Sequence, residues 1–487
     1  MRQIIVVSRP EDWPLDIPGV EVVTARDYLT DASWSALRSA RVYNVCRSYR
    51  YQANGYYVSL LAAARGHKPL PTINTIQDLK SQNTVRVSSA ELGRLIETSL
   101  KPLVSDHFVL SIYFGRNLAK RYERLSRALF NLFPAPLLRA EFRRLNDGWV
   151  LHRLGAPAFS EIPDDHREFL RESAERYFSG ARPRRPTRKS SRFDLAMLVN
   201  PEEPDPPSDE RALRRFEQAG EELGFNIERI YPDELGRLSE FDALFIRETT
   251  AVNHHTFRFA RRASAEGLVV IDDPDSILKC TNKVYLAELL QRNQIATPRT
   301  LLVHRDNADR VEAELGLPVV LKQPDSAFSV GVVKVHDRAA LKSTIIELLK
   351  SSDLIVAQEY LPTTFDWRVG LIDGRPLYAC RYHMARGHWQ IIHREGEKKN
   401  EGSSDTLSIG EAPPAVIQTA VRAAGLIGKG LYGVDLKQVD GRVVVIEVND
   451  NPSINAGVED VVLKGALYRD IMGVILQRVM ARKLGQP

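Results

Sequence analysis

Residues 431–455 constrain the fold of this chain more than any other segment. They read LYGVDLKQVDGRVVVIEVNDNPSIN, two strand-like runs that meet at Asp440-Gly441. Carboxylates are rare in the middle of a Val/Ile-rich strand, because burying a charge is costly unless it is paired or binds a metal. Here Glu447 and Asn449 are two residues apart and share one face of the second run, while Asp435 lies in the first. These three residues predict an oxygen-ligand cradle for Mg²⁺ and phosphates.

The turn decides whether the three residues meet. A two-residue loop at Asp440-Gly441 would set Asp435 opposite Ile446 and turn Glu447 to the other face of the sheet. A three-residue loop that includes Val439, with Gly441 left-handed, shifts the register and brings Asp435 onto the face of Glu447. We therefore predict this bulged hairpin. The alternative is an edge hairpin with its polar face in water, and the hairpin alone does not decide between the two.

Length and composition are those of a globular protein with several cores. The 487 residues allow about three domains, and 43% hydrophobic with 26% charged residues is an ordinary balance. The chain has no run of about 18 apolar residues, so we expect no membrane span, and its charged N-terminus does not read as a signal peptide. The net charge of +5 is too small for this length to indicate a nucleic-acid partner.

Three cysteines are scattered along the chain, Cys46, Cys280 and Cys380. They are odd in number and lack CxxC spacing, so the sequence predicts neither a disulfide framework nor a zinc site. A reducing, cytoplasmic location is the expectation.

A basic segment divides the chain. Residues 181–192, ARPRRPTRKSSR, carry six basic residues and two prolines and are predicted to be a linker rather than a nucleic-acid arm. An N-terminal module, 1–180, precedes it, with strands expected at 4–7 and 20–23 and amphipathic helices later. In 193–274, strands alternate with helices, which predicts an open parallel sheet covered on both faces.

The remaining residues, 275–487, contain further elements that suit a nucleotide. Lys283 opens a helix for which Thr281 is the expected cap, and Lys322 ends the apolar strand VVLK. Two lysines suit phosphates, and the small-residue loop SAFSVG at 326–331 can fold its N–H groups over phosphate oxygens. The strand that ends in QEYL, 358–361, can offer main-chain groups to adenine. Surface lysines, a hairpin loop and an edge strand would explain each feature singly, but not their order.

In this order the chain resembles the ATP-grasp superfamily and, within it, the RimK-like carboxylate–amine ligases. The matching segments are CTNKVYLAELLQRNQIATPRT, VVLKQPDSAFSVGVVKV, VAQEYLPTTFDWRVGLIDGRP and GLYGVDLKQVDGRVVVIEVNDNPSI. The likeness covers about 275–480. Segments 43–71 and 112–117 are similar to the module that precedes the ATP-grasp domain in one RimK-like subgroup. The resemblance implies a fold of class α/β and α+β: a pre-ATP-grasp α/β domain, two α+β ATP-grasp subdomains and an additional N-terminal domain.

The resemblance also implies roles for single residues. Phosphates would be held by Lys283, Lys322, Ser329 and Gly331, adenine by Gln358, Glu359, Tyr360 and Leu361, and ribose or the side of adenine by Asp366, with Glu359 as the other candidate for ribose. Two Mg²⁺ ions, which Mn²⁺ could replace, would be bound by Asp435, Glu447 and Asn449. Arg368 would lie near the transferred phosphate or acyl group and act in catalysis with Lys322.

The implied activity is ATP-dependent amide or peptide bond formation. A substrate carboxylate attacks the γ-phosphate of ATP to give an acylphosphate and ADP, and an amine then displaces the phosphate. An amino acid such as glutamate is the expected substrate. Two other interpretations stay open: a ligase that modifies the terminus or a side chain of a protein, and a non-catalytic ATP-binding scaffold. The expected partners are an amino acid or peptide, or a protein acceptor, and a homo-oligomer is compatible with all three.

Some residues depart from the family pattern or keep two interpretations. The loop SAFSVG holds one glycine where many relatives have several. Asn400 and Gly402 would stand in the acceptor region, where His383, His388 and His393 are interpreted as packing or surface residues. At the end of a strand, Arg247 would bind a substrate carboxylate or form a structural salt bridge.

Overall fold

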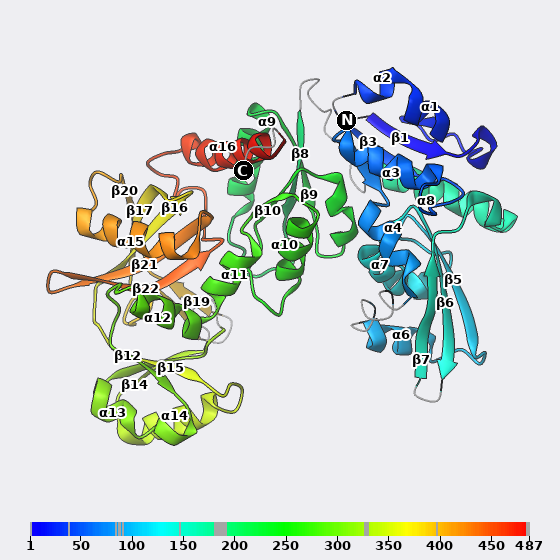
Figure 1. Cartoon of the computed structure of the whole chain (residues 1–487). Coiled ribbons are helices and arrows are strands. Elements are labelled where there is room, and N and C mark those ends of the chain that lie inside the picture. The colour runs from blue at the N-terminus through cyan, green and yellow to red at the C-terminus, as the bar shows by residue number, and fades with distance from the viewer. Residues whose placement is uncertain are drawn as a thin grey trace. The chain divides into compact units, whose positions relative to one another are not determined.

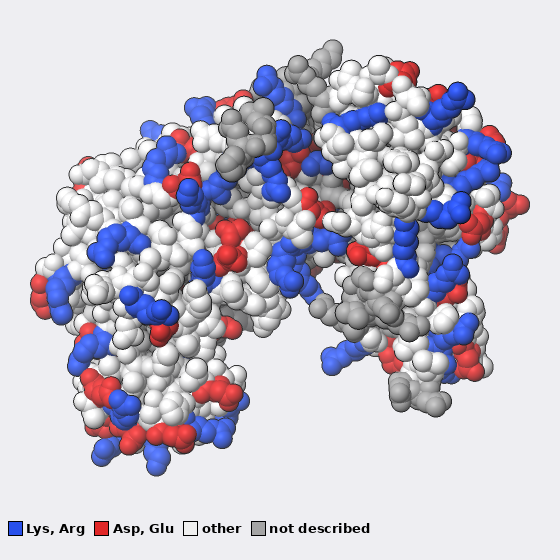
Figure 2. All heavy atoms as spheres, in the orientation of Figure 1, with Lys and Arg blue, Asp and Glu red and all other residues white. Residues whose placement is uncertain are grey.

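A computed structural model describes residues 2–37, 39–82, 85, 89, 92–145, 148–179, 192–325, 331–395 and 398–483. The chain forms two compact units (Figure 1). Unit 1 is Met1–Asp194 with Asp233–Asp242, and unit 2 is Leu195–Pro232 with Ala243–Pro487. The predicted linker, 181–192, lies outside the described residues except for Arg192. Figure 2 shows basic and acidic side chains interspersed over the visible face of each unit.

Unit 1 begins with a parallel sheet of order β2-β1-β3-β4. Its strands are β1 (Arg2–Val7), β2 (Val20–Thr24), β3 (Ala40–Asn44) and β4 (Lys68–Leu70). Helices α1 (Ala25–Thr30), α2 (Ala32–Ser35), α3 (Asn54–Ala64), α4 (Ile73–Lys80) and α6 (Gly93–Leu100) connect or follow them. The two strands expected here, at 4–7 and 20–23, are confirmed. The inner strand β1 is buried from Gln3 to Val7, as expected for an apolar run in a parallel sheet.

The later part of unit 1 contains a second sheet that the sequence reading missed. Strands β5 (His107–Tyr113), β6 (Leu137–Leu145) and β7 (Gly148–Gly155) are antiparallel. Helices α7 (Glu123–Leu132) and α8 (Arg167–Ser179) accompany it, so the expectation of helices is only partly right. In β6, LLRAEFRRL, buried residues such as Ala140 and Phe142 alternate with more exposed ones, because one face packs on the core.

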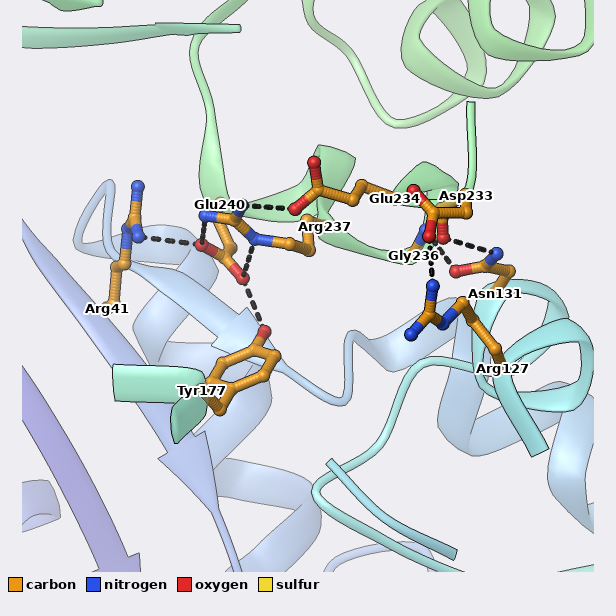
Figure 3. A network of polar contacts seen from close by, with 9 residues as sticks. All are labelled: Arg41, Arg127, Asn131, Tyr177, Asp233, Glu234, Gly236, Arg237 and Glu240. Carbon is orange, nitrogen blue, oxygen red and sulfur yellow. Dashed lines mark hydrogen bonds and ion pairs between the residues drawn. The ribbon is translucent and has the colours of Figure 1, made fainter. Parts of the chain in front are cut away.

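Unit 1 also takes in a short segment that follows much later in the sequence (Figure 3). Residues Asp233–Asp242 lie between β9 and β10 of unit 2 along the chain, yet they cluster with unit 1. Glu240, 3% exposed, pairs with Arg41 at 2.6 Å and with Arg237 at 3.2 Å, and it accepts a hydrogen bond from the Tyr177 hydroxyl. Burial alone would raise the pKa of Glu240, but the two guanidinium groups outweigh it and lower the pKa to about 2.

Unit 2 starts with the predicted open sheet, of order β11-β10-β8-β9. Strands β8 (Phe193–Leu198), β10 (Ala243–Ile246) and β11 (Val269–Ile271) are parallel, which confirms that expectation, and β9 (Phe225–Ile230) forms the other edge. The helices are α9 (Glu210–Glu222), α10 (His255–Ala265), α11 (Pro274–Thr281) and the C-terminal α16 (Gly465–Lys483), which packs on α9. The Asp209 side chain caps α9 by accepting from Ala212 N.

Two further sheets complete unit 2. Strands β12 (Thr300–Val303), β15 (Ile355–Glu359), β13 (Val319–Lys322) and β14 (Val332–Val335) form an antiparallel sheet with α13 (Arg310–Leu315) and α14 (Arg338–Leu348). The five-stranded sheet has the order β20 (Ser404–Leu407), β17 (Arg375–His383), β16 (Phe365–Ile372), β21 (Leu431–Val439) and β22 (Arg442–Asp450). Helices α12 (Lys283–Arg292) and α15 (Pro414–Ile427) pack on it, and β18 (Ile392–Glu395) pairs with β19 (Lys398–Glu401).

Two local expectations are wrong. The cap of α12 is Asn282, whose side chain accepts from Tyr285 N, whereas Thr281 ends α11 and donates to Ile277 O. An amide oxygen one residue closer to the helix satisfies the first-turn N–H group directly.

The hairpin turn has two residues, not the predicted three. Val439 pairs with Arg442, and both Asp440 (φ +50°) and Gly441 (φ +78°) are left-handed, the type I′ geometry that suits the twist of a hairpin. The extra residue that the register requires lies inside β22: Leu436 pairs with Val445 and Asp435 with Glu447, so Ile446 forms a bulge. The predicted consequence, Asp435 opposite Glu447, is therefore correct although its cause is different.

None of the described helices is both long and apolar enough to cross a membrane. The three cysteines are buried and form no disulfide.

Candidate active site

Polar side chains gather on one face of the five-stranded sheet, across its last three strands. The register joins Arg368 of β16 to Asp435 of β21, and Asp435 to Glu447 of β22. The side chains of Asp435 and Glu447 are 18% and 27% exposed. β22 is an edge strand of its sheet, as in the alternative interpretation, but these side chains are largely withdrawn from water, so the solvated polar face does not hold.

Asp435 is held from two sides. Arg368 Nε and Nη2 donate to its Oδ1 and Oδ2 at 2.6 and 2.7 Å, a two-pronged pair, and Asn449 Nδ2 donates to Oδ2 at 3.1 Å. The Arg368 guanidinium also lies 5.2 Å from the centre of the Tyr382 ring. Burial raises the pKa of Asp435 even though Arg368 opposes that shift. With its amide nitrogen used in this way, Asn449 keeps its oxygen for another ligand.

Two lysines face Glu447. Lys283 Nζ is 3.0 Å from Glu447 Oε1. Lys322 is half-buried, and burial together with the charge of Lys283 lowers its pKa to about 8, although Glu447 acts in the opposite direction. Burial would raise the pKa of Glu447, but Lys283 and Lys322 outweigh it and lower that pKa. Positive charge is therefore in surplus around Lys322, where an anion would relieve it.

A further lysine completes the face, and the sequence reading missed it. Lys437 Nζ donates to Asp366 Oδ1 and to Thr363 Oγ1, both at 2.6 Å. It follows Asp435 by two residues on the same strand, so the period of a strand places both on one face. That spacing was the signal that could have found it.

The residues present fit Mg²⁺ and a nucleoside triphosphate. Asp435, Glu447 and Asn449 offer oxygen ligands, which hard cations prefer. Lys283, Lys322, Arg368 and Lys437 offer N–H donors and positive charge, which phosphates require. The carboxylates of this face are paired with these cations in the structure. A bound metal ion can take the place of a cation beside a carboxylate, and a phosphate can take the place of a carboxylate beside a cation.

The predicted adenine segment, 358–361, begins in the last two residues of β15. This strand lies between β12 and β13, so the main chain of Gln358 and Glu359 takes part in the ladders rather than forming a free edge. The Glu359 carboxylate accepts from Arg299 N at 2.8 Å and from Arg299 Nε at 2.7 Å. Tyr360 and Leu361 come after the last strand residue.

The predicted phosphate loop, 326–331, is described only at its end. Ser329 lies in 326–330, outside the described residues. Gly331 has φ +70°, and its carbonyl accepts from Gln323 N at 3.0 Å. A Cβ at Gly331 would lie 3.0 Å from Gln323 Oε1, so both conformation and space favour glycine there.

Sequence comparisons identify the family to which this site belongs. Residues 25–173 match the family model described as the RimK-like ATPgrasp N-terminal domain, and residues 280–464 match that of the RimK-like ATP-grasp domain. The chain belongs to the RimK-like ATP-grasp family. The recognition, the ATP-grasp fold and the class of enzyme, an ATP-grasp ligase, are thereby confirmed as predicted.

Relatives of this RimK-like chain include proteins named probable alpha-L-glutamate ligase. The one from Alcanivorax borkumensis is 26% identical over 245 residues, 49% of this chain and 76% of the relative. The one from Marinomonas sp. is 24% identical over 288 residues, 55% of this chain and 91% of the relative. Among solved structures, a D-alanine–D-alanine ligase from Bacillus anthracis aligns with a TM-score of 0.47 at 17% identity, over 60% of this chain and 99% of that chain.

Arg247 of this RimK-like protein has neither of the roles considered for it. It is 1% exposed, and its guanidinium donates to Ser208 Oγ, Asn451 Oδ1 and the carbonyls of Pro207 and Pro452. These partners carry no formal charge, and burial lowers its pKa to about 10. Arg247 therefore connects the end of β10 to the segment after β22 through hydrogen bonds, and its guanidinium also lies over the rings of Phe216 and Phe245.

Of the acceptor-region residues, His383 lies away from the polar face. His383 pairs with Phe365 in the ladder and bonds Asp405 through Nε2 at 2.7 Å, which places it on the opposite face of the sheet from Arg368. His388 Nδ1 accepts from Gln390 N, and the His393 side chain lies outside the described residues. Asn400 lies on β19, and a Cβ on Gly402 would be 1.8 Å from His383 O.

Proposed function

We propose that this chain is an ATP-dependent ligase that joins a carboxylate to an amine through an acylphosphate, with an amino acid such as glutamate as one substrate. The observation that supports it most is the bidentate Arg368–Asp435 pair beside the Lys283–Glu447 pair on one sheet face. Carboxylates for metal ions and fixed cations for phosphoryl groups are the parts that phosphoryl transfer needs. The relatives named alpha-L-glutamate ligases support the choice of glutamate.

Each predicted residue receives a role in this proposal. Lys283 and Lys322 hold phosphates with Gly331 and Ser329, while Tyr360 and Leu361 meet adenine beside Gln358 and Glu359. Asp366, which Lys437 holds in place, faces ribose. Asp435, Glu447 and Asn449 bind two Mg²⁺ ions, for which Mn²⁺ can substitute. The metal ions supply neutralising charge to the phosphates. Arg368 stabilises charge on the transferred phosphoryl group, and Lys322 does so from the adjacent sheet.

An assay of ATP turnover tests the proposal. Purified protein is incubated with ATP, Mg²⁺, single and pooled amino acids, and hydroxylamine to trap an acylphosphate. We expect phosphate release that depends on glutamate and a glutamyl hydroxamate visible by mass spectrometry. Release only with a protein fraction would indicate a ligase that modifies proteins. Tight ATP binding without release in any mixture would contradict the ligase and leave a scaffold.

Binding of ATP should change the protonation of Lys322. Its pKa of about 8 in the free protein means that it is largely neutral at pH 8.5, and phosphate beside it raises that pKa. We expect uptake of about 0.5–0.8 proton on binding Mg²⁺-ATP at pH 8.5 and about none at pH 6.5. Calorimetric titration in buffers with different ionisation enthalpies measures this, and Lys322→Met should abolish the uptake. Equal uptake in that variant would assign the proton to another group.

Other expectations stand as proposals beside the ligase. The sequence patterns given above support the division into 1–180, 181–192, 193–274 and 275–487 and the cytoplasmic location. A protein acceptor and a homo-oligomer are compatible with the ligase.

A further inference from the structure

Three potential metal ligands meet at a second place in unit 2. Glu248, His254 and His255 each present a ligand atom, and these atoms all lie within 4.8 Å of one another. The cluster stands on the loop after β10 and at the start of α10, and it shares no residue with the oxygen-rich face formed by Asp435 and Glu447.

The carboxylate of this cluster is buried and oriented. The Glu248 side chain is 2% exposed and that of His255 is 16% exposed. His255 Nε2 lies 2.7 Å from Glu248 Oε2, and Asn200 Nδ2 donates to Glu248 Oε1 at 3.1 Å. A ligand whose second oxygen is fixed by an outer hydrogen bond is typical of metal sites, where such partners set ligand orientation.

The backbone around the cluster is fixed as well. Asn451 Nδ2 donates to Glu248 O at 2.5 Å, and the Glu203 carboxylate accepts from Thr249 N at 3.1 Å. Asn200 and Glu248 follow the carboxyl ends of the parallel strands β8 and β10. Ligands of open parallel sheets bind at this edge. The loop is therefore both preorganised and in a position where a ligand is expected.

We propose that Glu248, His254 and His255 bind one divalent transition-metal ion of the zinc class. Two imidazoles and one carboxylate form a donor set that suits Zn²⁺ and leaves a fourth position for water, whereas Mg²⁺ prefers oxygen ligands alone. Ligand atoms around tetrahedral Zn²⁺ are about 3.3 Å apart. Here the ligand atoms lie within 4.8 Å of one another, and small rotations of the side chains would bring them to that spacing. The short His255–Glu248 bond is then the metal-free form of the same pair.

Cobalt binding tests the site, because Co²⁺ replaces Zn²⁺ and absorbs visible light when bound by nitrogen and oxygen ligands. The full chain is titrated with Co²⁺ in excess Mg²⁺, and bound cobalt is counted by equilibrium dialysis. We expect one strongly bound ion per chain, displaced by Zn²⁺. His254→Gln and His255→Gln should each weaken its binding about 10- to 100-fold.

Two controls separate this site from other candidates. His383→Gln removes a histidine that also pairs with a carboxylate, Asp405 at 2.7 Å, and should leave cobalt binding unchanged. Glu447→Gln alters the proposed ATP site and should leave it unchanged too, so failure of the ligase proposal would not affect this result. No absorbance, or equal losses in all four variants, would overturn the proposal. If His255→Gln unfolds on heating earlier than the wild type, His254→Gln decides, since His254 does not share the Glu248 hydrogen bond.

Discussion

Replacing Glu447 by glutamine is expected to lower kcat about 100- to 1000-fold, the loss typical of removing one group that stabilises transition-state charge. The amide keeps the size of the side chain but lacks the negative charge that Lys283 contacts at 3.0 Å and that Lys322 faces. A neutral amide is also a weaker ligand for a hard cation. Turnover should therefore fall far more than stability.

Phosphate release at saturating ATP and varied Mg²⁺ measures the effect, with thermal unfolding as the test of the fold. Higher Mg²⁺ should restore part of the activity, because weakened ligation raises the concentration needed. Glu347→Gln is a matched control, since Glu347 is 69% exposed on α14 and pairs only with Lys350 among the described residues. Wild-type turnover in Glu447→Gln would remove Glu447 from the metal site.

The ligand face shows what strand patterns can and cannot predict. The prediction that Asp435 meets Glu447 is correct, but it depended on a three-residue turn, and the two-residue Asp440-Gly441 turn alone would set Asp435 opposite Ile446. The position of the bulge was not predicted, because no local signal in the run RVVVIEV marks Ile446 as the extra residue. The two-residue period of a strand could also have placed Lys437 on the face of Asp435, although the resemblance did not suggest this residue.

Strand patterns do not predict contacts between segments that are far apart in the sequence. Arg247 looked like a residue for a substrate or a salt bridge, but its partners come from 207–208 and 451–452, which no local signal connects to it. In the same way, the sequence LGRLSE gives no sign that it folds with unit 1. The buried polar groups of these two places are paired only because the tertiary fold brings their partners to them.

Glu240→Gln should destabilise unit 1 by about 3–5 kcal/mol, the usual effect of breaking a buried ion pair from one side. The variant leaves Arg41, whose side chain is 4% exposed, and Arg237 without the carboxylate they share. The lowered pKa of Glu240, about 2, agrees in magnitude: relative to 4.5 it corresponds to about 3 kcal/mol of stabilisation near neutral pH.

The stability difference between Glu240→Gln and the wild type should depend on pH in a defined direction. A carboxyl group whose pKa is lower in the folded than in the unfolded chain stabilises the fold at pH values above its unfolded pKa. For Glu240 this stabilisation is lost as the pH falls through about 2. The difference between Glu240→Gln and the wild type should therefore be full at pH 7 and shrink between pH 4.5 and pH 2. Hydrogen exchange of β3 and α8 in the full chain reports on unit 1 separately from unit 2.

Glu234→Gln is the matched control, because Glu234 is 22% exposed and bonds Arg237 at 2.8 Å at the rim of the same network. The Glu234 side chain is more exposed than that of Glu240 (4%), which pairs with Arg41 as well as with Arg237, so the loss of Glu234 is expected to cost less, about 1 kcal/mol. Exchange in β3 should accelerate about 100-fold or more in Glu240→Gln and less than about 10-fold in Glu234→Gln. Similar exchange rates in the two variants would show that Glu240 is not the main residue that stabilises the packing of segment 233–242 in unit 1.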